Sequence, residues 1–280
     1  MLRLAGFLLF VGLLVSPGCR KPTPDQPRLF TRIDARESGL YFNNEIVRFE
    51  TDAFNSLSYD PMYNGAGVGI GDFNRDGRSD VFMAGNNVSS RIFLNKGDFK
   101  FEDISEKAGI RTDRWCTGVS VADVNQDGWP DVYVCVAGPL EAGQDSSRRA
   151  NYLFINQGVG ANGVPRFSEK AVEYGLADTG FSTQAAFFDY DRDGDLDCYV
   201  LTNALERQGR NVIRPKRLDG SGPSTDRLYR NDSGPSHGRQ SSVDSRQSKK
   251  TIPDDYRLTT DNLHFTNVSR QAGVLAEGYG

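Results

Sequence analysis

The stretch that decides the fold is "GDFNRDGRSDVFMAGN", residues 71–86. It places oxygen-bearing side chains at alternate positions around Gly77 and then runs into an apolar segment. Alternate oxygen donors in a tight turn can converge on one cation. Several unrelated classes of cation loop begin in this way, so this stretch alone leaves the class of protein open.

The acidic pattern recurs twice more along the chain. Residues 72–80 read "DFNRDGRSD", residues 123–131 read "DVNQDGWPD" and residues 189–197 read "DYDRDGDLD". All three follow D-x-[DN]-x-D-G-x-x-D without a gap, and the periods between them are 51 and 66 residues. A period of this size indicates a repeat architecture, which has to be considered before any other fold.

Two further blocks repeat in step with the acidic loops. One block has Phe and Gly eight residues apart, in "FEDISEKAG" (101–109), "FSEKAVEYG" (167–175) and "FTNVSRQAG" (265–273). The other block ends in an asparagine, at Asn95, Asn156 and Asn231. From Gly109 to Asp123 is 14 residues, and from Gly175 to Asp189 is again 14, which ties the blocks into one unit.

Each unit contains four short segments rich in β-branched and aromatic residues, such as "VGIGD" before an acidic loop and "DVYVC" after one. No helical period appears, apart from a helical turn expected at "ISEKAG". Four strands per repeat predict an all-β fold, a β-propeller of four-stranded blades. An open β-solenoid is the main alternative, and it does not account for four unequal strands per unit.

The units resemble FG-GAP repeats, also called VCBS-type repeats, which occur in the integrin α-subunit propeller and in many bacterial surface proteins. The pairing of "YNGAGVGIGDFNRDGRSDVFMAGN" with "NKGDFKFEDISEKAGI" is similar to a bacterial group that often carries a C-terminal ASPIC/UnbV-type domain. The resemblance covers residues 30–280. It implies a non-enzymatic binding, adhesion or scaffold module.

The repeat predicts an incomplete propeller of about three blades. The 14-residue spacing expects a fourth acidic loop near position 287, beyond Gly280. "FTRIDARESG", residues 30–39, resembles "FTNVSRQAG" and is expected to be a closing strand. We therefore expect three blades with closing-strand ends, as in an N-terminal fragment of a longer parent.

The acidic loops predict up to three calcium sites, because Ca²⁺ takes six to eight hard oxygen ligands. The candidate ligands are side chains at positions 1, 3, 5 and 9 of each loop and the carbonyl of position 7: Asp72, Asn74, Asp76, Arg78 and Asp80; Asp123, Asn125, Asp127, Trp129 and Asp131; Asp189, Asp191, Asp193, Asp195 and Asp197. The third loop has four such carboxylates and should bind most tightly. Gly77, Gly128 and Gly194 should adopt a positive φ.

Other metal sites fit less well. An EF-hand needs an acid at position 12 and flanking helices, whereas position 12 is Met83, Val134 and Val200 within predicted strands. Mg²⁺ prefers octahedral geometry and keeps its waters. Zn²⁺ needs a Cys or His cluster, and the sequence has only two histidines.

The N-terminus reads as an export signal. Residues 1–18 combine Arg3 with an apolar run of 12 residues, which is short for a bilayer span. "LLVSPGC" resembles a bacterial lipoprotein signal that lipidates Cys19, with ordinary cleavage as the alternative. Residues 19–29 would be a Pro-rich tether and residues 30–280 the propeller, with a low-complexity insertion at 232–256. The expected location is the bacterial outer membrane or cell surface, or the periplasm or medium.

The loops between the second and third strands predict a ligand face opposite the calcium loops. Its candidate residues are Trp115, Arg148, Arg149, Arg207, Arg210, Arg214, Lys216 and Arg217, which would suit an acidic glycan or a protein partner. The net charge of -4 gives no reason to expect nucleic-acid binding. No catalytic constellation is visible, and the alternative is a part of a larger carbohydrate-acting enzyme whose catalytic residues lie elsewhere. The disulfide state of Cys116, Cys135 and Cys198 stays open.

Overall fold

The computed structural model describes residues 29–46, 60–138, 145–203, 217–222, 224–233 and 263–276. The chain divides into two units, Met1–Asp34 and Ala35–Gly280, and all the sheets belong to the second. The export signal, Cys19 and most of the 232–256 insertion lie outside the described residues. Among the residues that are described, no helix has the length and apolar character needed to cross a membrane.

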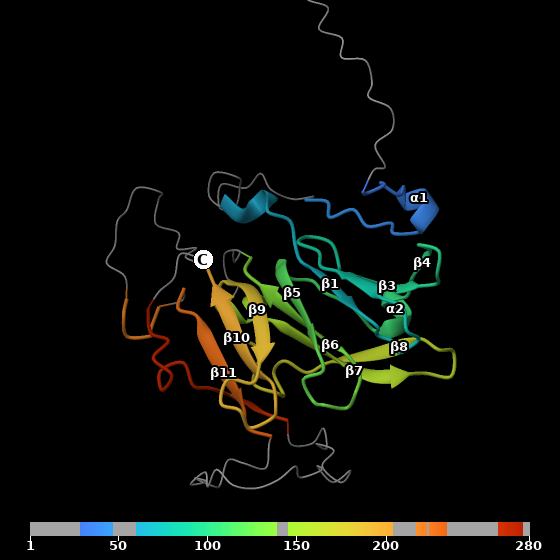
Figure 1. Ribbon diagram of the computed structural model, residues 1–280. Helices are drawn as coiled ribbons and strands as arrows, with labels where there is room; N and C mark the ends of the chain where they lie inside the picture. Colours follow the sequence, from blue (N-terminus) through green and yellow to red (C-terminus); the bar gives the residue numbers. More distant parts are fainter. Residues whose placement is uncertain are drawn as a thin grey trace, which may run out of the picture. The chain divides into compact units, whose positions relative to one another are not determined.

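Within the described residues, twelve strands form three antiparallel sheets of four strands, each in sequence order (Figure 1). Sheet 1 contains β1 (Val68–Gly71), β2 (Asp80–Met83), β3 (Arg91–Asn95) and β4 (Phe101–Asp103). Sheet 2 contains β5 (Cys116–Ala122), β6 (Asp131–Val136), β7 (Tyr152–Val159) and β8 (Pro165–Glu169). Sheet 3 contains β9 (Ser182–Phe188), β10 (Asp197–Thr202), β11 (Arg227–Asn231) and β12 (Phe265–Asn267). The predicted all-β, propeller-like fold is confirmed.

Helix is limited to short turns. The expected turn at "ISEKAG" is α2 (Ser105–Ala108), and α1 (Ala35–Ser38) is its counterpart in the "FTRIDARESG" segment. Two 3₁₀ turns lie at Asp60–Tyr63 and Ser146–Arg149. The closing strand expected at the start of residues 30–39 does not form, because no described strand pairs with that segment.

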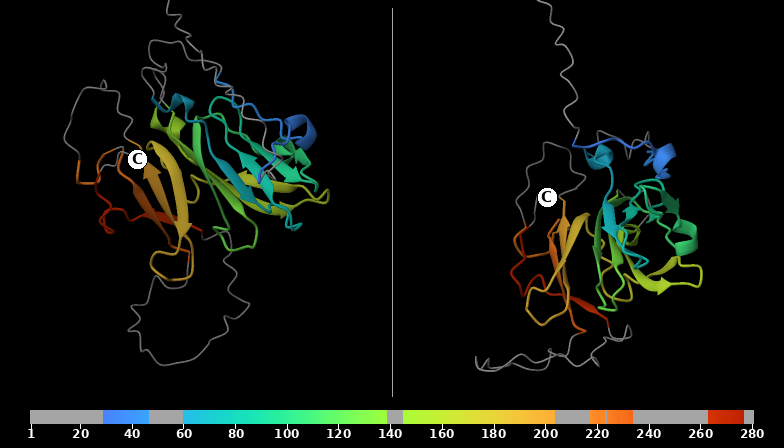
Figure 2. Two further views of the ribbon diagram at one scale, coloured as in Figure 1. Left: turned by 45° about the horizontal axis from the view of Figure 1, so that its top comes forward. Right: turned by 45° about the vertical axis from the view of Figure 1, so that its right-hand side comes forward.

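The first strands of the three sheets are neighbours, in the order β1, β5, β9 (Figures 1 and 2). A Cβ added at Gly69 of β1 would lie 2.8 Å from the side chains of Val119 and Val121 on β5. The sequence "VGIG" therefore forms an inner strand whose glycines let the next sheet approach closely. Each acidic loop joins an inner strand to the second strand of its sheet.

The core lies between the sheets, in two clusters that meet at β6. Val132, Val134 and Val136 pack in the cluster shared with sheet 1, and Tyr133 and Cys135 pack in the cluster shared with sheet 3. All six residues of β6 are buried. A strand buried on both faces reads as a continuous apolar run, which is why "DVYVCV" shows no alternation.

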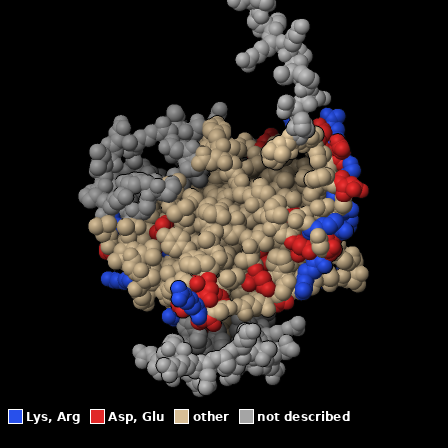
Figure 3. All heavy atoms as spheres, in the orientation of Figure 1, with Lys and Arg blue, Asp and Glu red and all other residues tan. Residues whose placement is uncertain are grey.

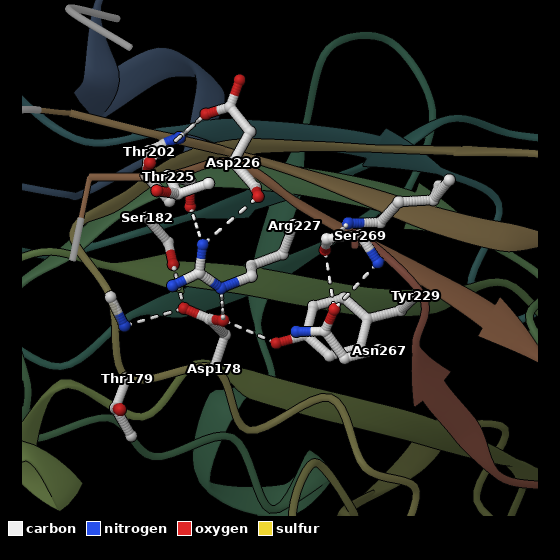
Figure 4. A network of polar contacts seen from close by, with 12 residues as sticks. Asp178, Thr179, Ser182, Thr202, Thr225, Asp226, Arg227, Tyr229, Asn267 and Ser269 are labelled. Atoms are coloured by element: carbon white, nitrogen blue, oxygen red, sulfur yellow. Dashed lines mark hydrogen bonds and ion pairs between the residues drawn. The ribbon is translucent and has the colours of Figure 1, made fainter. Parts of the chain in front are cut away.

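A polar network joins sheets 2 and 3 beside the second cluster (Figure 4). Asp178, in the connection to β9, accepts a hydrogen bond from the Tyr229 hydroxyl at 2.5 Å, and the Nε of Arg227 lies 3.9 Å from the same oxygen. The other Asp178 oxygen accepts from the Gly180 N–H at 2.7 Å. A buried carboxylate needs such partners, so this network holds the connection between the sheets in place.

The cysteines that the sequence left open are free thiols. Cys116, Cys135 and Cys198 are all buried and unpaired with one another. Burial raises the pKa of the Cys116 thiol to about 11, so it stays protonated at neutral pH. These cysteines act as small core side chains.

Candidate metal centre

The three acidic loops share one backbone path. The glycine at position 6 has a positive φ in each loop, 85° at Gly77, 89° at Gly128 and 98° at Gly194, as predicted. The residue at position 4 also lies in the left-handed region, at Arg75, Gln126 and Arg192. Nothing in the loop pattern predicted this second feature, because side chains of these types rarely take a positive φ.

The first aspartate of each loop holds the turn together. In the first loop, Asp72 accepts the N–H of Asp76 at 2.9 Å and the N–H of Gly77 at 2.8 Å, one on each oxygen. Asp123 accepts the equivalent N–H groups in the second loop, at 3.0 and 2.7 Å. Asp189 does the same in the third loop, at 3.1 and 3.2 Å. These bonds stabilise the strained backbone at positions 4 and 6.

The last aspartate of each loop joins three strands. Asp80, Asp131 and Asp197 have no exposed surface. One oxygen of Asp131 accepts the N–H of Val124 at 3.0 Å, and the other accepts the N–H of Asn156 at 2.8 Å. Asp80 accepts the equivalent N–H groups, those of Phe73 and Asn95. Asp197 accepts those of Tyr190 and Asn231.

The asparagine that ends the third strand is a structural partner that sequence reasoning missed. Asn156 donates its side-chain amide to the carbonyl of Pro130 at 3.2 Å and to that of Phe73 at 2.9 Å. Asn95 and Asn231 likewise donate to the carbonyl just before their own last aspartate. The signal was the asparagine that closes each "-FLN" block.

Carboxylates gather most closely in the third loop. Oxygens of Asp189, Asp191 and Asp197 lie within 4.8 Å of one another, the one group of three acidic, His or Cys ligand atoms found within the described residues. In the first two loops, position 3 is an asparagine whose amide donates to the position-5 carboxylate, Asn74 to Asp76 at 2.8 Å and Asn125 to Asp127 at 2.9 Å. An ionised aspartate has no N–H or O–H to donate, so Asp191 at position 3 of the third loop cannot make this hydrogen bond to the position-5 carboxylate.

Asp195 adds a fifth acidic side chain to the third loop. The sequence assigned only its carbonyl as a ligand, yet its side chain is 3% exposed and neither carboxylate oxygen has a hydrogen-bond partner. The equivalent residue is an exposed Arg78 in the first loop and a partly exposed Trp129 in the second. A buried carboxylate without a partner is costly, and a bound cation is one way to satisfy it.

Residues 53–134 match the family model of the FG-GAP-like repeat. This part of the chain, residues 53–134, is similar to FG-GAP-like repeats. Cartilage acidic protein 1 of Xenopus tropicalis is 28% identical over 186 residues, 65% of this chain and 27% of that protein. The chain thus spans about a quarter of the length of this relative. The FG-GAP-like match agrees with the resemblance seen in the sequence and with the three four-stranded sheets.

Burial raises the pKa values of several carboxyls in the acidic loops. It raises the pKa of Asp80 to about 6 and that of Asp131 to about 8. Burial, with the neighbouring Asp193 charge second, raises the pKa of Asp195 to about 7. The pKa of Asp197 is raised by burial as well. A nearby divalent cation would favour the ionised forms, so these sites fit a cation chemically.

Adjacent loops are also linked to each other through position 4. The guanidinium carbon of Arg75 lies 5.1 Å from the centroid of the Trp129 ring in the second loop. Gln126 of the second loop donates its amide to the carbonyl of Gly194 in the third loop at 2.7 Å. The three loops therefore lie side by side at one end of the sheets.

The predicted ligand face is only partly described. Trp115 is 8% exposed and lines a cavity. Arg148 pairs with Asp113 at 2.9 Å, and Arg149 lies over the Phe181 ring. Arg217 is exposed. The remaining predicted cations lie outside the described residues: Arg207, Arg210, Arg214 and Lys216. The described arginines at 148 and 149 are thus already engaged within the fold.

Proposed function

We propose that this chain is a calcium-stabilised, exported binding module of the β-propeller type. The observation that carries the proposal is the third acidic loop. Three carboxylates there converge within 4.8 Å beside Asp195, a buried carboxylate without hydrogen-bond partners. FG-GAP-like repeats often bind calcium and are typical of extracellular or exported proteins.

The donor set suits calcium better than other common cations. All the side chains are hard oxygen donors, which Ca²⁺ accepts in flexible coordination with six to eight ligands. In the third loop, Asp189, Asp191, Asp193, Asp195 and Asp197 would hold the ion. In the first two loops an asparagine replaces one carboxylate, so we expect weaker binding there. The ion would neutralise the buried carboxylates and lock the turn between the first and second strands.

Binding rather than catalysis is the function that the described residues support. Their acidic clusters are committed to the loop turns, and the polar network around Asp178 is filled by its own hydrogen bonds. We propose that the face opposite the acidic loops carries the ligand, a glycan or a protein. Export and attachment through a lipidated Cys19 are part of the proposal. A Cys19→Ser variant that still fractionates with membranes would contradict the anchor.

Direct calcium binding tests the proposal. Calcium-stripped protein is titrated with CaCl₂ by isothermal titration calorimetry, alongside Asp189→Asn, Asp195→Asn and, as a matched control outside the loops, Asp98→Asn. We expect the tightest site to be lost in Asp189→Asn and weakened about tenfold or more in Asp195→Asn, a loss of about 1.4 kcal/mol. The control should bind as wild type. Absence of calcium binding by the wild-type chain would reject the proposal.

A further inference from the structure

A cavity lies where the three inner strands begin, at the end opposite the acidic loops. Its volume is about 290 Å³, near the lower end of small-ligand pockets, which span about 300–1,000 Å³. The polar and aromatic side chains that line it are Asn64, Trp115, Thr117, Thr183, Gln184 and Asn203. Glycines and alanines complete the wall, and none of the described lining residues is charged.

The lining repeats with the units, which shows that the cavity belongs to the fold. Gly67, Gly118 and Gln184 each stand five residues before an acidic loop, and Thr117 and Thr183 each stand six residues before one. The second and third sheets therefore contribute residues near the start of β5 and β9, and the first contributes the residues just before β1. The cavity is fixed by the same strand packing that positions the loops.

Hydrogen bonds within the fold determine which lining atoms can accept a hydrogen bond from a ligand. The Thr117 hydroxyl donates to the carbonyl of Ser182 at 2.7 Å, and the Thr183 hydroxyl donates to that of Leu201 at 3.2 Å. The Gln184 amide nitrogen donates to the carbonyl of Val119 at 3.1 Å. Since these donors are used, the oxygens of all three side chains remain as acceptors.

The acceptor-rich lining calls for a ligand with several donors. The Asn64 and Asn203 side-chain amides make no hydrogen bond to another described residue, so they can both donate and accept. Among the described lining residues, an anionic ligand would meet three acceptors and no cation, and a cationic ligand would find no carboxylate to pair with. The strands that bear the described lining are neutral too, because β1, β5 and β9 carry no charged residue. In Figure 3 the described side chains over the middle of the molecule are uncharged, and the charged ones lie toward its edges.

We propose that this cavity binds a neutral, hydroxyl-rich ring, the terminal sugar of an uncharged glycan. Sugar hydroxyls donate to the Thr and Gln oxygens and exchange hydrogen bonds with the Asn amides, and Trp115 offers apolar contact to the ring. The inference rests on the proposed function as a binding module and names its ligand class. It replaces the acidic ligand expected from the arginine-rich loops.

The test uses the two tryptophans of the chain, of which Trp115 lines the cavity and Trp129 belongs to the second acidic loop. Full-length protein labelled with 5-fluorotryptophan gives two ¹⁹F resonances, assigned through Trp129→Phe. The probes are the methyl glycosides of glucose, galactose, mannose and N-acetylglucosamine, with glucuronate and glucosamine as charged comparators. We expect at least one neutral glycoside to shift the Trp115 resonance with a Kd of about 1 mM or below, as for a ligand of a dozen heavy atoms.

Two variants of lining residues test whether the glycosides bind in the cavity. Asn203→Ala and Thr183→Val should each weaken binding about tenfold or more, whereas Asn87→Ala, an exposed asparagine that does not line the cavity, should bind as wild type. An unchanged Trp129 resonance shows that a variant is folded. No shift of Trp115 with any neutral glycoside, tighter binding of a charged comparator, or wild-type binding by both cavity variants would overturn the inference. The Trp129 resonance reports calcium separately: if calcium shifts it and glycosides leave Trp115 unchanged, only the sugar site fails.

Discussion

Asp131 has no exposed surface, and its two carboxylate oxygens accept hydrogen bonds from the backbone of Val124 and Asn156. The sequence identified this residue as a metal ligand because it stands at position 9 of the loop. The structure adds that it holds the start of β6 against β5 and β7. A carboxylate oxygen has more than one lone pair, so both roles can coexist.

Replacing Asp131 with asparagine should destabilise the fold even without calcium. The amide nitrogen of the new side chain would face an N–H donor, which leaves at least one buried backbone donor unsatisfied at a cost of about 1–3 kcal/mol. In chelator at about pH 9, above the raised pKa of Asp131 of about 8 so that both its oxygens accept, the melting temperature should fall by roughly 3–10 °C. Asp98→Asn, at an exposed position with a φ of 49° that asparagine tolerates, is the matched control. Equal melting temperatures for the two variants would show that Asp131 has no structural role.

The raised pKa values of the buried carboxyls predict an unusual pH dependence for the calcium-free protein. Burial raises the pKa values of Asp80, Asp131 and Asp195 to about 6, 8 and 7, against about 4 in the unfolded chain. Between the unfolded and the native pKa values, the native state binds more protons than the unfolded chain does. The free energy of unfolding should therefore fall as the pH rises from about 5 to about 8. Saturating calcium holds the carboxylates ionised and should remove this decline. Thermal unfolding of calcium-stripped protein at about pH 5 and about pH 8 measures this decline. A higher melting temperature at about pH 8 would contradict the prediction.

At the scale of elements, the glycine that ends an "F…G" block packs closely against the last strand of the following sheet where that sheet is present. A Cβ at Gly175 would lie 2.4 Å from the carbonyl oxygen of Phe265 on β12, and one at Gly39 equally close to that of Phe101 on β4. At Gly273 a Cβ would meet nothing within 4 Å among the described residues. All three glycines have a positive φ. A Cβ at Gly109 would likewise lie 3.1 Å from the carbonyl oxygen of Phe167, so the same turn is covered at Gly39, Gly109 and Gly175 and open at Gly273.

Alanine at these glycines should separate strain from crowding. Gly273→Ala adds only the left-handed strain, about 1–2 kcal/mol. Gly175→Ala adds a clash with a backbone carbonyl that cannot move freely, which should cost about 1–3 kcal/mol more. Urea unfolding of the two variants measures the difference. If both lose the same stability, the contact between the sheets at this turn is not as close as the structure has it.

The elements also show what sequence could and could not predict. The acidic loops, the four strands per unit and the turn at α2 follow from repeated residues at fixed spacing. The absence of a strand at residues 30–34 did not, because a strand exists only where a partner is present. The side chain of Asp195 was missed because its burial depends on the fold around position 7, which the loop pattern does not encode. The cavity was missed because its lining comes from neutral residues of three separate units.

For the whole molecule, the loops act together. Arg75 contacts the second loop and Gln126 contacts the third, so each loop is bonded to its neighbour. The clusters that meet at β6 join all three sheets in the same way. Ions bound at the loops would therefore stabilise the described sheets as a unit and hold the opposite end, with its cavity, in a fixed geometry.

Thermal unfolding of the calcium-stripped protein at neutral pH, with and without calcium, tests this account most directly. Calcium at about 100 times its Kd should add about 2.7 kcal/mol, which corresponds to a rise in melting temperature of roughly 5–10 °C. Magnesium at the same concentration should give a smaller rise, since it sheds its waters reluctantly. Identical melting temperatures in calcium and in chelator would contradict the claim that calcium holds these loops.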